Sequence, residues 1–224
     1  LQKKMAAHLA AAIKTPMAGY PAYSLLTGFI GTAWISKALS DNGMSEEAYR
    51  LLQYEGYPSW LYPVKNGATT IWERLNSYTV KDGFGENNSM NSFNHYSFGA
   101  VASWMYNYSL GICRDEKSPG FKHFILKPEV DPTRGITHAE GYYDSMYGRI
   151  RSRWQYTDSG IRYEFTVPAN TTASLYLPAP AVSFISENGK PLKKASGVRY
   201  VSADKELHHL ELASGSYQFD IKQK

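Results

Sequence analysis

The spacing of the apolar residues changes once along this chain, and this change limits the possible folds more than any other feature. Up to about residue 112, apolar side chains recur every three or four positions, which is the period of an amphipathic helix. Beyond about residue 118 they alternate in short runs, which is typical of β-strands. The sequence therefore predicts a helical part followed by a sheet part.

The helical part carries two apolar stripes that we expect to face a core. The first repeats at every fourth residue of the opening helix, and the second runs through residues 25–39. The stripes contain Leu1, Met5, Leu9, Ile13 and then Leu25, Leu26, Phe29, Ile30, Ala33, Trp34, Ala38 and Leu39. Ser45 is expected to cap a short helix ending near Leu52, and a last helix is expected from about Asn94 to Gly111.

The sheet part contains six alternating runs separated by turn sequences. The runs are Phe121–Lys127, Gly148–Tyr156, Ile161–Val167, Ala173–Leu177, Val198–Val201 and Leu207–Leu212. Residues 158–160 (Asp-Ser-Gly) and 187–190 (Glu-Asn-Gly-Lys) are typical of hairpin turns. These runs and turns predict an antiparallel β-sandwich. We expect domains at residues 1–112 and 121–224, joined by a charged, turn-forming linker over residues 113–120.

Composition excludes several classes of protein. With 43% hydrophobic residues the chain can bury a core, and its net charge of +4 is too small for a nucleic-acid-binding surface. The single cysteine, Cys113, excludes an internal disulfide and a cysteine-rich zinc site, and we expect no membrane partner because no apolar stretch reaches the length of a spanning helix. The chain enters a helical pattern at Leu1, so we expect processing, trimming or a missing upstream region. The compartment is left open, with an extracytoplasmic location preferred.

Glu73 is the candidate catalytic residue. It lies between Trp72 and Arg74 in a segment rich in loop-forming residues. Burial against an aromatic ring raises the pKa of a carboxyl group, whereas a neighbouring arginine keeps it ionised, so Glu73 could take a proton from water. The alternative is structural: Glu73 pairs with Arg74 or caps the nearby helix. Asp82, Glu86 and Glu55 are expected at the surface.

His95 and Asn94 are candidate substrate contacts at the start of the last predicted helix. An imidazole can donate a hydrogen bond to a sugar hydroxyl, and an asparagine amide can both donate and accept. The alternatives are a satisfied structural histidine and ordinary helix capping by the asparagine and serine residues there.

Aromatic residues are concentrated around these candidates, with 11 of the 51 residues from Tyr54 to Trp104 being Phe, Tyr or Trp. Tyr57, Trp60 and Trp72 are candidate stacking residues, together with Tyr62, because sugar rings present C–H faces that pack on aromatic faces. The alternative is that at least half of these four rings fill the core. No metal site or nucleotide cofactor is expected, since His208 and His209 alternate across a strand and no phosphate-binding glycine loop occurs.

Several segments resemble the bacterial α-L-rhamnosidases of glycoside hydrolase family 78. The longest are GYPSWLYPVKNGATTIWERL (residues 56–75) and SMNSFNHYSFGAVASWMY (residues 89–106), and TGFIGTAWISKALSDNG (residues 27–43) and the strand from Tyr147 to Trp154 add to them. The resemblance spans nearly the whole chain. It implies that residues 1 to about 112 are the closing helices of an (α/α)6 barrel and that a C-terminal β-sandwich follows.

The resemblance also implies an activity and roles for two residues. In that family two carboxylates cleave the rhamnosyl bond with inversion, so Glu73, in the TTIWER motif, would be the general base. His95, in the NSFNHY motif, would contact rhamnose. The general acid would lie upstream of Leu1, in the first half of the barrel. We expect the C-terminal portion of an inverting α-L-rhamnosidase, whose partners are a rhamnose-containing glycan or glycoside and the upstream half of its own barrel. The alternatives are a non-catalytic carbohydrate-binding module and a purely structural piece.

Overall fold

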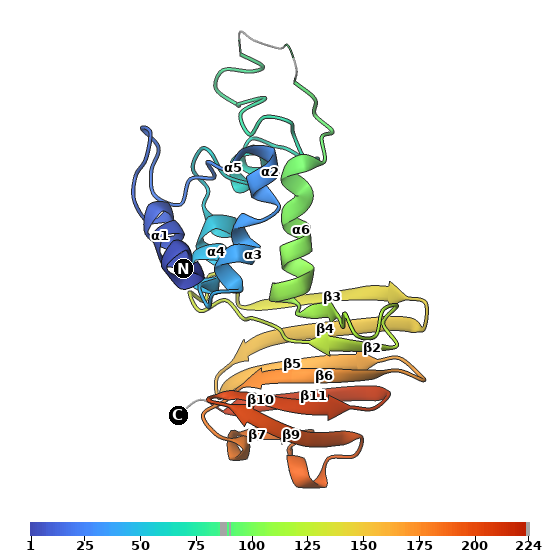
Figure 1. Cartoon of the computed structure of the whole chain (residues 1–224). Helices are drawn as coiled ribbons and strands as arrows, with labels where there is room; N and C mark the ends of the chain where they lie inside the picture. Colours follow the sequence, from blue (N-terminus) through green and yellow to red (C-terminus); the bar gives the residue numbers. More distant parts are fainter. Residues whose placement is uncertain (86–88, 90, 223–224) are drawn as a thin grey trace. The chain divides into compact units, whose positions relative to one another are not determined.

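The computed structural model describes residues 1–85, 89 and 91–222, and it divides into two compact units (Figure 1). Unit 1 consists of Leu1–Trp104 together with Asp131–Gly135. Unit 2 consists of residues 105–130 and the described residues from Ile136 onward. Glu86, one of the acids expected at the surface, lies outside the described residues.

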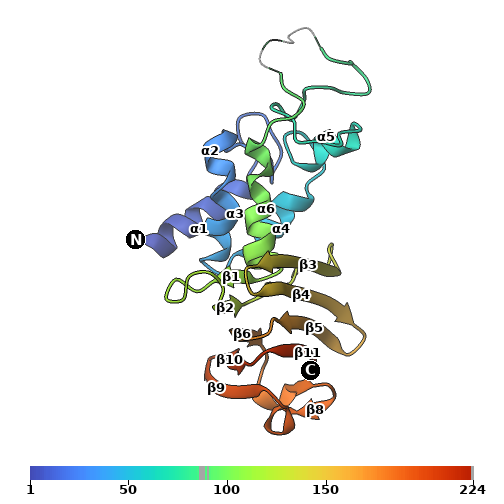
Figure 2. The same cartoon turned by 90° about the vertical axis from the view of Figure 1, so that its right-hand side faces the viewer.

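Unit 1 is helical, and long loops connect its later helices (Figure 2). Its elements are α1 (Gln2–Ile13), α2 (Gly28–Thr32), α3 (Ile35–Ser40), α4 (Ser45–Gln53), α5 (Leu61–Lys65), the 3-10 helix η1 (Ser97–Ala100) and α6 (Val101–Trp104). The last helical stretch continues as a π-helical turn, η2 (Met105–Ser109), which belongs to unit 2. Across the described part of the chain, no helix combines the length and apolarity needed to cross a membrane.

The core of unit 1 forms where α3, α4 and α6 pack together. Leu39 of α3 and Tyr49 of α4 are fully buried. The Tyr49 and Trp104 rings make a T-shaped contact, with 5.0 Å between the ring centroids, and the Trp104 indole donates a 2.9 Å hydrogen bond to the Ser40 hydroxyl. This core fixes the helices on which the loops of unit 1 are mounted.

The two apolar stripes are only partly buried, which corrects the sequence-based expectation. In the first stripe, Leu1 and Met5 are 97% and 64% exposed, and Ala6 and Ala10 are buried instead. In the second, Ile30 is 85% exposed. A helical period shows that residues share a face, but it does not show that the same chain covers that face.

Two helix boundaries also differ from expectation. The single helix expected over residues 25–39 is interrupted at Ala33 and Trp34, between α2 and α3. Ser45 is the first residue of α4 and Met44 precedes it as the N-cap, without a side-chain cap. The Ser45 hydroxyl instead donates a 2.9 Å hydrogen bond to Ser40, so it ties α4 to α3.

Unit 2 contains two β-sheets (Figure 1). Its strands are β1 (Ile112–Arg114), β2 (His123–Leu126), β3 (His138–Ser145), β4 (Gly148–Thr157), β5 (Gly160–Val167), β6 (Thr172–Pro178), β7 (Ile185–Glu187), β8 (Lys190–Pro191), β9 (Val198–Asp204), β10 (Leu207–Leu212) and β11 (Gly215–Lys222), with 3-10 turns η3 (Val182–Phe184) and η4 (Leu192–Lys194). The five-stranded sheet has the order β1-β2-β6-β10-β9 and the six-stranded sheet β3-β4-β5-β11-β7-β8. All pairs are antiparallel except β2 with β6.

The alternating apolar faces of these sheets form the core of unit 2. Trp154 and Phe219 from the six-stranded sheet and Phe124 and Leu175 from the five-stranded sheet are fully buried. The Trp154 indole donates a 2.8 Å hydrogen bond to the Ser109 carbonyl, so its polar atom is satisfied inside the core. On β4 and β5 of the six-stranded sheet, polar residues that include Arg151, Arg153 and Glu164 lie between the buried residues.

The strand predictions hold for the regular runs and omit five strands. The six predicted runs correspond to β2, β4, β5, β6, β9 and β10, and the two turn sequences join β4 to β5 and β7 to β8 in hairpins. The omitted strands are β1, β3, β7, β8 and β11. β1 occupies the beginning of the segment expected to be a linker.

Candidate functional site

The two motif-bearing loops of unit 1 lie side by side. The backbone N–H of His95 donates to the carbonyl of Ile71, and the N–H of Glu73 donates to the carbonyl of Ser92, each over 2.8 Å. Residues 71–73 and 92–95 are therefore held together by main-chain hydrogen bonds, although 18 residues separate the two segments. The side chains of Glu73 and His95 come from these paired segments.

The Glu73 carboxylate is half-buried and is held by one backbone donor. Its Oε2 accepts a 2.8 Å hydrogen bond from the N–H of Ser92. Among the described residues Oε1 has no hydrogen-bond partner, and Glu73 makes no ion pair with Arg74. The second oxygen remains available to accept a proton or a hydrogen bond from a bound molecule.

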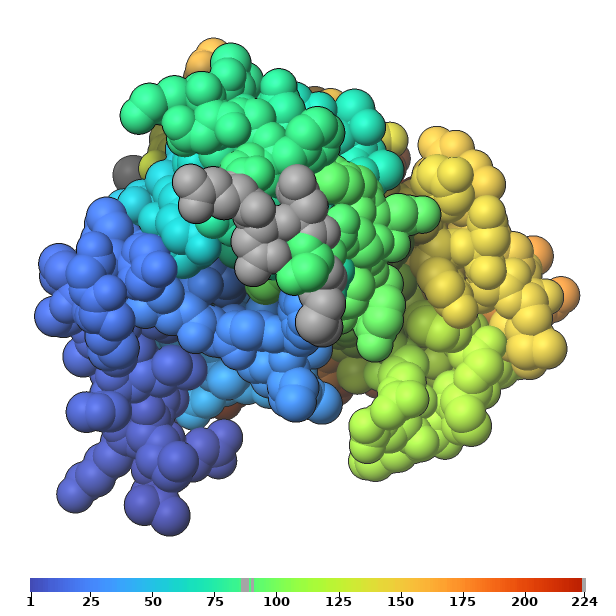
Figure 3. All heavy atoms as spheres, turned by 90° about the horizontal axis from the view of Figure 1, so that it is seen from above, coloured from blue at the N-terminus to red at the C-terminus, as the bar shows by residue number. Residues whose placement is uncertain are grey.

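An open cleft of about 380 Å³ in unit 1 contains Glu73. Segments near residues 20–29, 57–58 and 73–76 meet around it, and the face seen in Figure 3 brings together the early and middle parts of the chain. Its lining residues are Tyr20, Leu25, Leu26, Gly28, Phe29, Tyr57, Pro58, Glu73, Arg74, Leu75, Asn76 and Phe98. The cleft combines a carboxylate, a guanidinium and several aromatic rings.

His95 contacts a residue of the cleft wall but does not itself line the cleft. Its ring stacks on the Phe29 ring, with 4.8 Å between centroids and 24° between planes, and Phe29 lines the cleft. The N–H of Ser97 lies 3.4 Å from His95 Nδ1, which assigns Nδ1 as an acceptor and places the proton of a neutral ring on Nε2. That proton has no acceptor among the described residues. His95 can therefore donate one hydrogen bond.

Tyr57 also lines the cleft. Its ring makes edge contacts with Tyr20, at 5.8 Å between centroids, and with Tyr62, at 5.3 Å. Burial raises the pKa of the Tyr57 phenol, and the neighbouring tyrosines add to this effect while Arg74 opposes it. The phenol is thus a neutral hydrogen-bonding group at ordinary pH.

The remaining predicted contacts do not line the cleft. Trp60 and Trp72 are only 8% and 6% exposed. The Trp60 indole donates a 2.9 Å hydrogen bond to the Phe98 carbonyl. Two of the four candidate stacking rings are thus buried. This agrees with the alternative that at least half of them fill the core. Asn94 is exposed, and its backbone N–H donates to the Ser92 hydroxyl over 3.2 Å.

Sequence reasoning missed Phe29, Tyr20 and Asn76 as cleft residues. Phe29 fits the apolar period of its segment, which predicts a core position, but its ring is 41% exposed. Tyr20 and Asn76 carry no motif signal on their own. Only the pairing of distant loops brings them beside Glu73.

In the part of the chain that the structure describes, no group of three or more His, Cys, Asp or Glu side chains could hold a metal ion. His208 is buried, with Nε2 3.1 Å from the Ala179 carbonyl, whereas His209 contacts Glu211 at 2.9 Å. The two histidines point to opposite faces of β10, as predicted.

Two family models match consecutive parts of the chain. The bacterial alpha-L-rhamnosidase 6 hairpin glycosidase domain matches residues 2–109, and the bacterial alpha-L-rhamnosidase C-terminal domain matches residues 111–191. The matches confirm the expected fold class, with barrel helices first and a β-sandwich after them.

Individual relatives agree with the family models. An alpha-L-rhamnosidase of Alteromonas sp. (strain LOR) is 36% identical over 199 residues, which are 88% of this chain and 20% of the relative. One from Streptomyces avermitilis is 35% identical over 89% of this chain and 18% of the relative. The crystal structure of the Streptomyces avermitilis alpha-L-rhamnosidase complexed with L-rhamnose superimposes with a TM-score of 0.84 and 33% identity, covering 98% of this chain and 20% of that chain. The chain thus spans about a fifth of the length of these relatives.

Proposed function

This chain belongs to the bacterial α-L-rhamnosidase family, and we propose that it is the C-terminal portion of an inverting enzyme that removes terminal α-L-rhamnose from glycans or glycosides. The observation that carries the proposal is the position of Glu73. Its carboxylate lies at an open cleft with one oxygen held by the Ser92 amide and the other without a partner among the described residues. A general base needs this combination of fixed orientation and an available acceptor.

In the proposed reaction Glu73 activates the attacking water. The carboxylate takes a proton from water as the oxygen bonds to the anomeric carbon of rhamnose, and the glycosidic oxygen leaves with a proton from a general acid. Inversion requires the two carboxyl groups to lie about 6.5–9.5 Å apart, so that water fits between base and sugar. We assign the general acid to the upstream half of the barrel in the longer polypeptide.

The other predicted contact residues have different proposed roles, according to how exposed they are. His95 donates its free Nε2–H to a rhamnose hydroxyl, and exposed Asn94 adds a second polar contact beside it. Tyr57 offers a neutral phenol and a ring within the cleft. Buried Trp60 and Trp72 contribute by fixing the loops that carry these groups.

The proposed partner of unit 1 is the upstream half of the same barrel. Exposed apolar side chains on α2 and beside it support this, since Ile30 and Trp34 are 85% and 61% exposed. A solvent-exposed apolar surface of this kind is typical of an interface.

We propose the domain limits that the sequence indicates. They are residues 1–112 for the barrel portion, 113–120 for the linker and 121–224 for the β-sandwich.

The decisive experiment replaces Glu73 in the longer enzyme. Glu73→Gln should lower kcat on a chromogenic α-L-rhamnoside by at least about 10²-fold, the low end for loss of a general base. Glu55→Gln is the matched control, because Glu55 is an exposed carboxylate paired with Lys65 away from the cleft. NMR of the product should detect β-L-rhamnose first.

Three results would contradict the proposal. They are near-normal activity of Glu73→Gln, release of α-L-rhamnose first, and clear turnover by residues 1–224 alone, which would place a complete acid–base pair within this chain. If the chain were a non-catalytic binding module, the turnover of the longer polypeptide would not depend on Glu73.

His95→Ala tests the substrate contact separately. Loss of one hydrogen bond that leaves a polar partner unmatched costs about 2 kcal/mol, which lowers kcat/KM by about 30-fold. An unchanged kcat and KM would make His95 a purely structural residue that packs on Phe29.

A further inference from the structure

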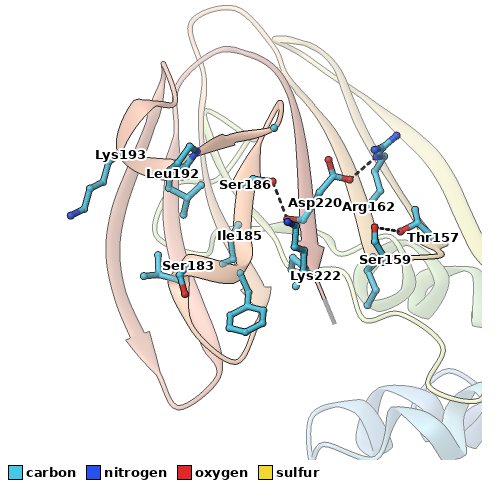
Figure 4. Close-up of a pocket in the computed structure, with 16 residues that line it drawn as sticks. Thr157, Ser159, Arg162, Ser183, Ile185, Ser186, Leu192, Lys193, Asp220 and Lys222 are labelled. Carbon is cyan, nitrogen blue, oxygen red and sulfur yellow. Dashed lines mark hydrogen bonds and ion pairs between the residues drawn. The ribbon is translucent and has the colours of Figure 1, made fainter. Parts of the chain in front are cut away.

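One cavity of the described chain lies in the β-sandwich of unit 2, and the proposed rhamnosidase chemistry does not use it. Its volume is about 750 Å³, twice that of the cleft at Glu73 and within the range of small-molecule sites. Strands β5, β7 and β11, the turn after β4 and the short elements η3 and η4 surround it. Figure 4 shows Arg162 and Asp220 on one side, Leu192 on the other and Ile185 between them.

Arg162 lines the cavity, and only part of its hydrogen-bonding capacity is used within the protein. Its Nε donates a 2.7 Å hydrogen bond to Asp220, whose other carboxylate oxygen accepts from Gln218 at 3.2 Å. The two terminal nitrogens of the guanidinium have no partner among the described residues, and the side chain is 36% exposed. A guanidinium fixed at one edge with a free terminal fork suits recognition of a carboxylate.

The charge around the cavity is positive. Lys222 also lines it and has no ion pair among the described residues, so Arg162 and Lys222 outweigh the single carboxylate of Asp220. Lys193 extends away from the cavity in Figure 4 and contributes only to the potential at its rim. This excess favours an anionic ligand.

The rest of the lining suits a polyhydroxylated molecule. Four hydroxyl side chains border the cavity, those of Thr157, Ser159, Ser183 and Ser186. Among the apolar lining residues, Val182 is 42% exposed and Ile161 and Phe184 are partly exposed, whereas Ile185, Leu192 and Ile221 are buried. Hydroxyl groups donate and accept to sugar hydroxyls, and apolar side chains pack against the C–H faces of a sugar ring.

We propose that this cavity is a second glycan-binding site, which takes an acidic saccharide and holds its carboxylate on Arg162. The choice of a saccharide over another hydroxylated anion rests on the proposed function, whereas the preference for an anion rests on the charges alone. The site would keep an acidic polysaccharide attached to the enzyme while rhamnose is removed elsewhere.

The test uses a ligand without rhamnose, so that it does not depend on the cleft at Glu73. A trimer of D-galacturonic acid is titrated into the 224-residue chain by calorimetry, beside the same trimer with its carboxylates reduced to alcohols. The acidic trimer should bind at least about tenfold more tightly, as expected for a charge-assisted hydrogen bond. Equal affinities, or no binding of the acidic trimer, would overturn the proposal.

Variants locate the binding. Arg162→Gln should weaken binding of the acidic trimer at least about tenfold, and Lys222→Gln about threefold, because the latter removes only a nearby charge. Arg199→Gln on β9 is the matched control, since Arg199 is an exposed arginine that does not line the cavity.

If Arg162→Gln reduces folding, Lys222→Gln decides the question, because the exposed Lys222 has no structural partner among the described residues. A loss equal to that of Arg199→Gln would overturn the proposal. Glu73→Gln should leave binding of the trimer unchanged. Acid-trimer binding that fails while the longer enzyme stays active would reject this site and leave the proposed function standing.

Discussion

Gly111 is the position where the structure makes its sharpest prediction about stability. The residue adopts φ +68°, and a Cβ placed on it would lie 2.1 Å from the nitrogen of Pro128 and 2.2 Å from the carbonyl carbon of Lys127. These are backbone atoms, so no side-chain rotation relieves the overlap. The Lys127 N–H also donates a 2.9 Å hydrogen bond to the Gly111 carbonyl, and separating the segments would break it.

Two terms give the expected cost of Gly111→Ala. A non-glycine residue in the left-handed region costs about 1–2 kcal/mol. Forcing packed atoms apart adds about 1–3 kcal/mol. The substitution should therefore lower the free energy of unfolding of unit 2 by about 2–5 kcal/mol.

Gly189→Ala separates the two terms. Gly189 has a similar φ of +74°, but a Cβ placed on it would have no atom within 4 Å, so only the conformational cost applies. Urea unfolding should be followed in protein labelled with 5-fluorotryptophan, because Trp154 is the one tryptophan of the chain in unit 2 and reports on that unit alone. Equal destabilisation by the two substitutions, within about 0.5 kcal/mol, would refute the close approach of Gly111 to Lys127 and Pro128.

Two further predictions concern the cores of the two units. Trp154→Phe removes a fully buried indole and its hydrogen bond to the Ser109 carbonyl. It should therefore lower the free energy of unfolding by about 2–3 kcal/mol, measured as a lower urea midpoint. An unchanged midpoint would contradict this packing. Burial raises the pKa of Tyr57, so the folded state favours the neutral phenol and the unfolded chain ionises first, near pH 10. Stability of unit 1 should therefore be complete below about pH 10 and fall above it, and Tyr57→Phe should reduce that fall in urea midpoints measured from about pH 9 to 11; identical slopes would argue against burial of the phenol.

The regular strands could be predicted from sequence because one face of each is buried. In β4, β5 and β10 buried residues alternate with residues that are partly or fully exposed, which produces the alternating pattern directly. β3 is an edge strand with none of its residues buried, so the pattern has no apolar face to display. β11 does alternate, with Tyr217, Phe219 and Ile221 buried, so its pattern was open to prediction as well.

The candidate site was predictable only where a local motif carries it. Glu73 and His95 stand out because polar groups interrupt aromatic, loop-forming segments, and the resemblance adds roles to both. Their pairing through Ile71 and Ser92 depends on main-chain hydrogen bonds between segments distant in sequence, which no local pattern encodes.

Phe29 illustrates why the remaining cleft residues escaped prediction. Its spacing from Leu25 satisfies a helical stripe, and Leu25 is indeed buried at 4% exposure, yet Phe29 is 41% exposed and lines the cleft. One apolar period therefore serves two surfaces: Leu25 contributes to the core of unit 1, and Phe29 supports the ring of His95 at the cleft. The free energy gained by burying an apolar side chain is the same whichever surface covers it, so the sequence pattern cannot distinguish a core face from the wall of a binding site.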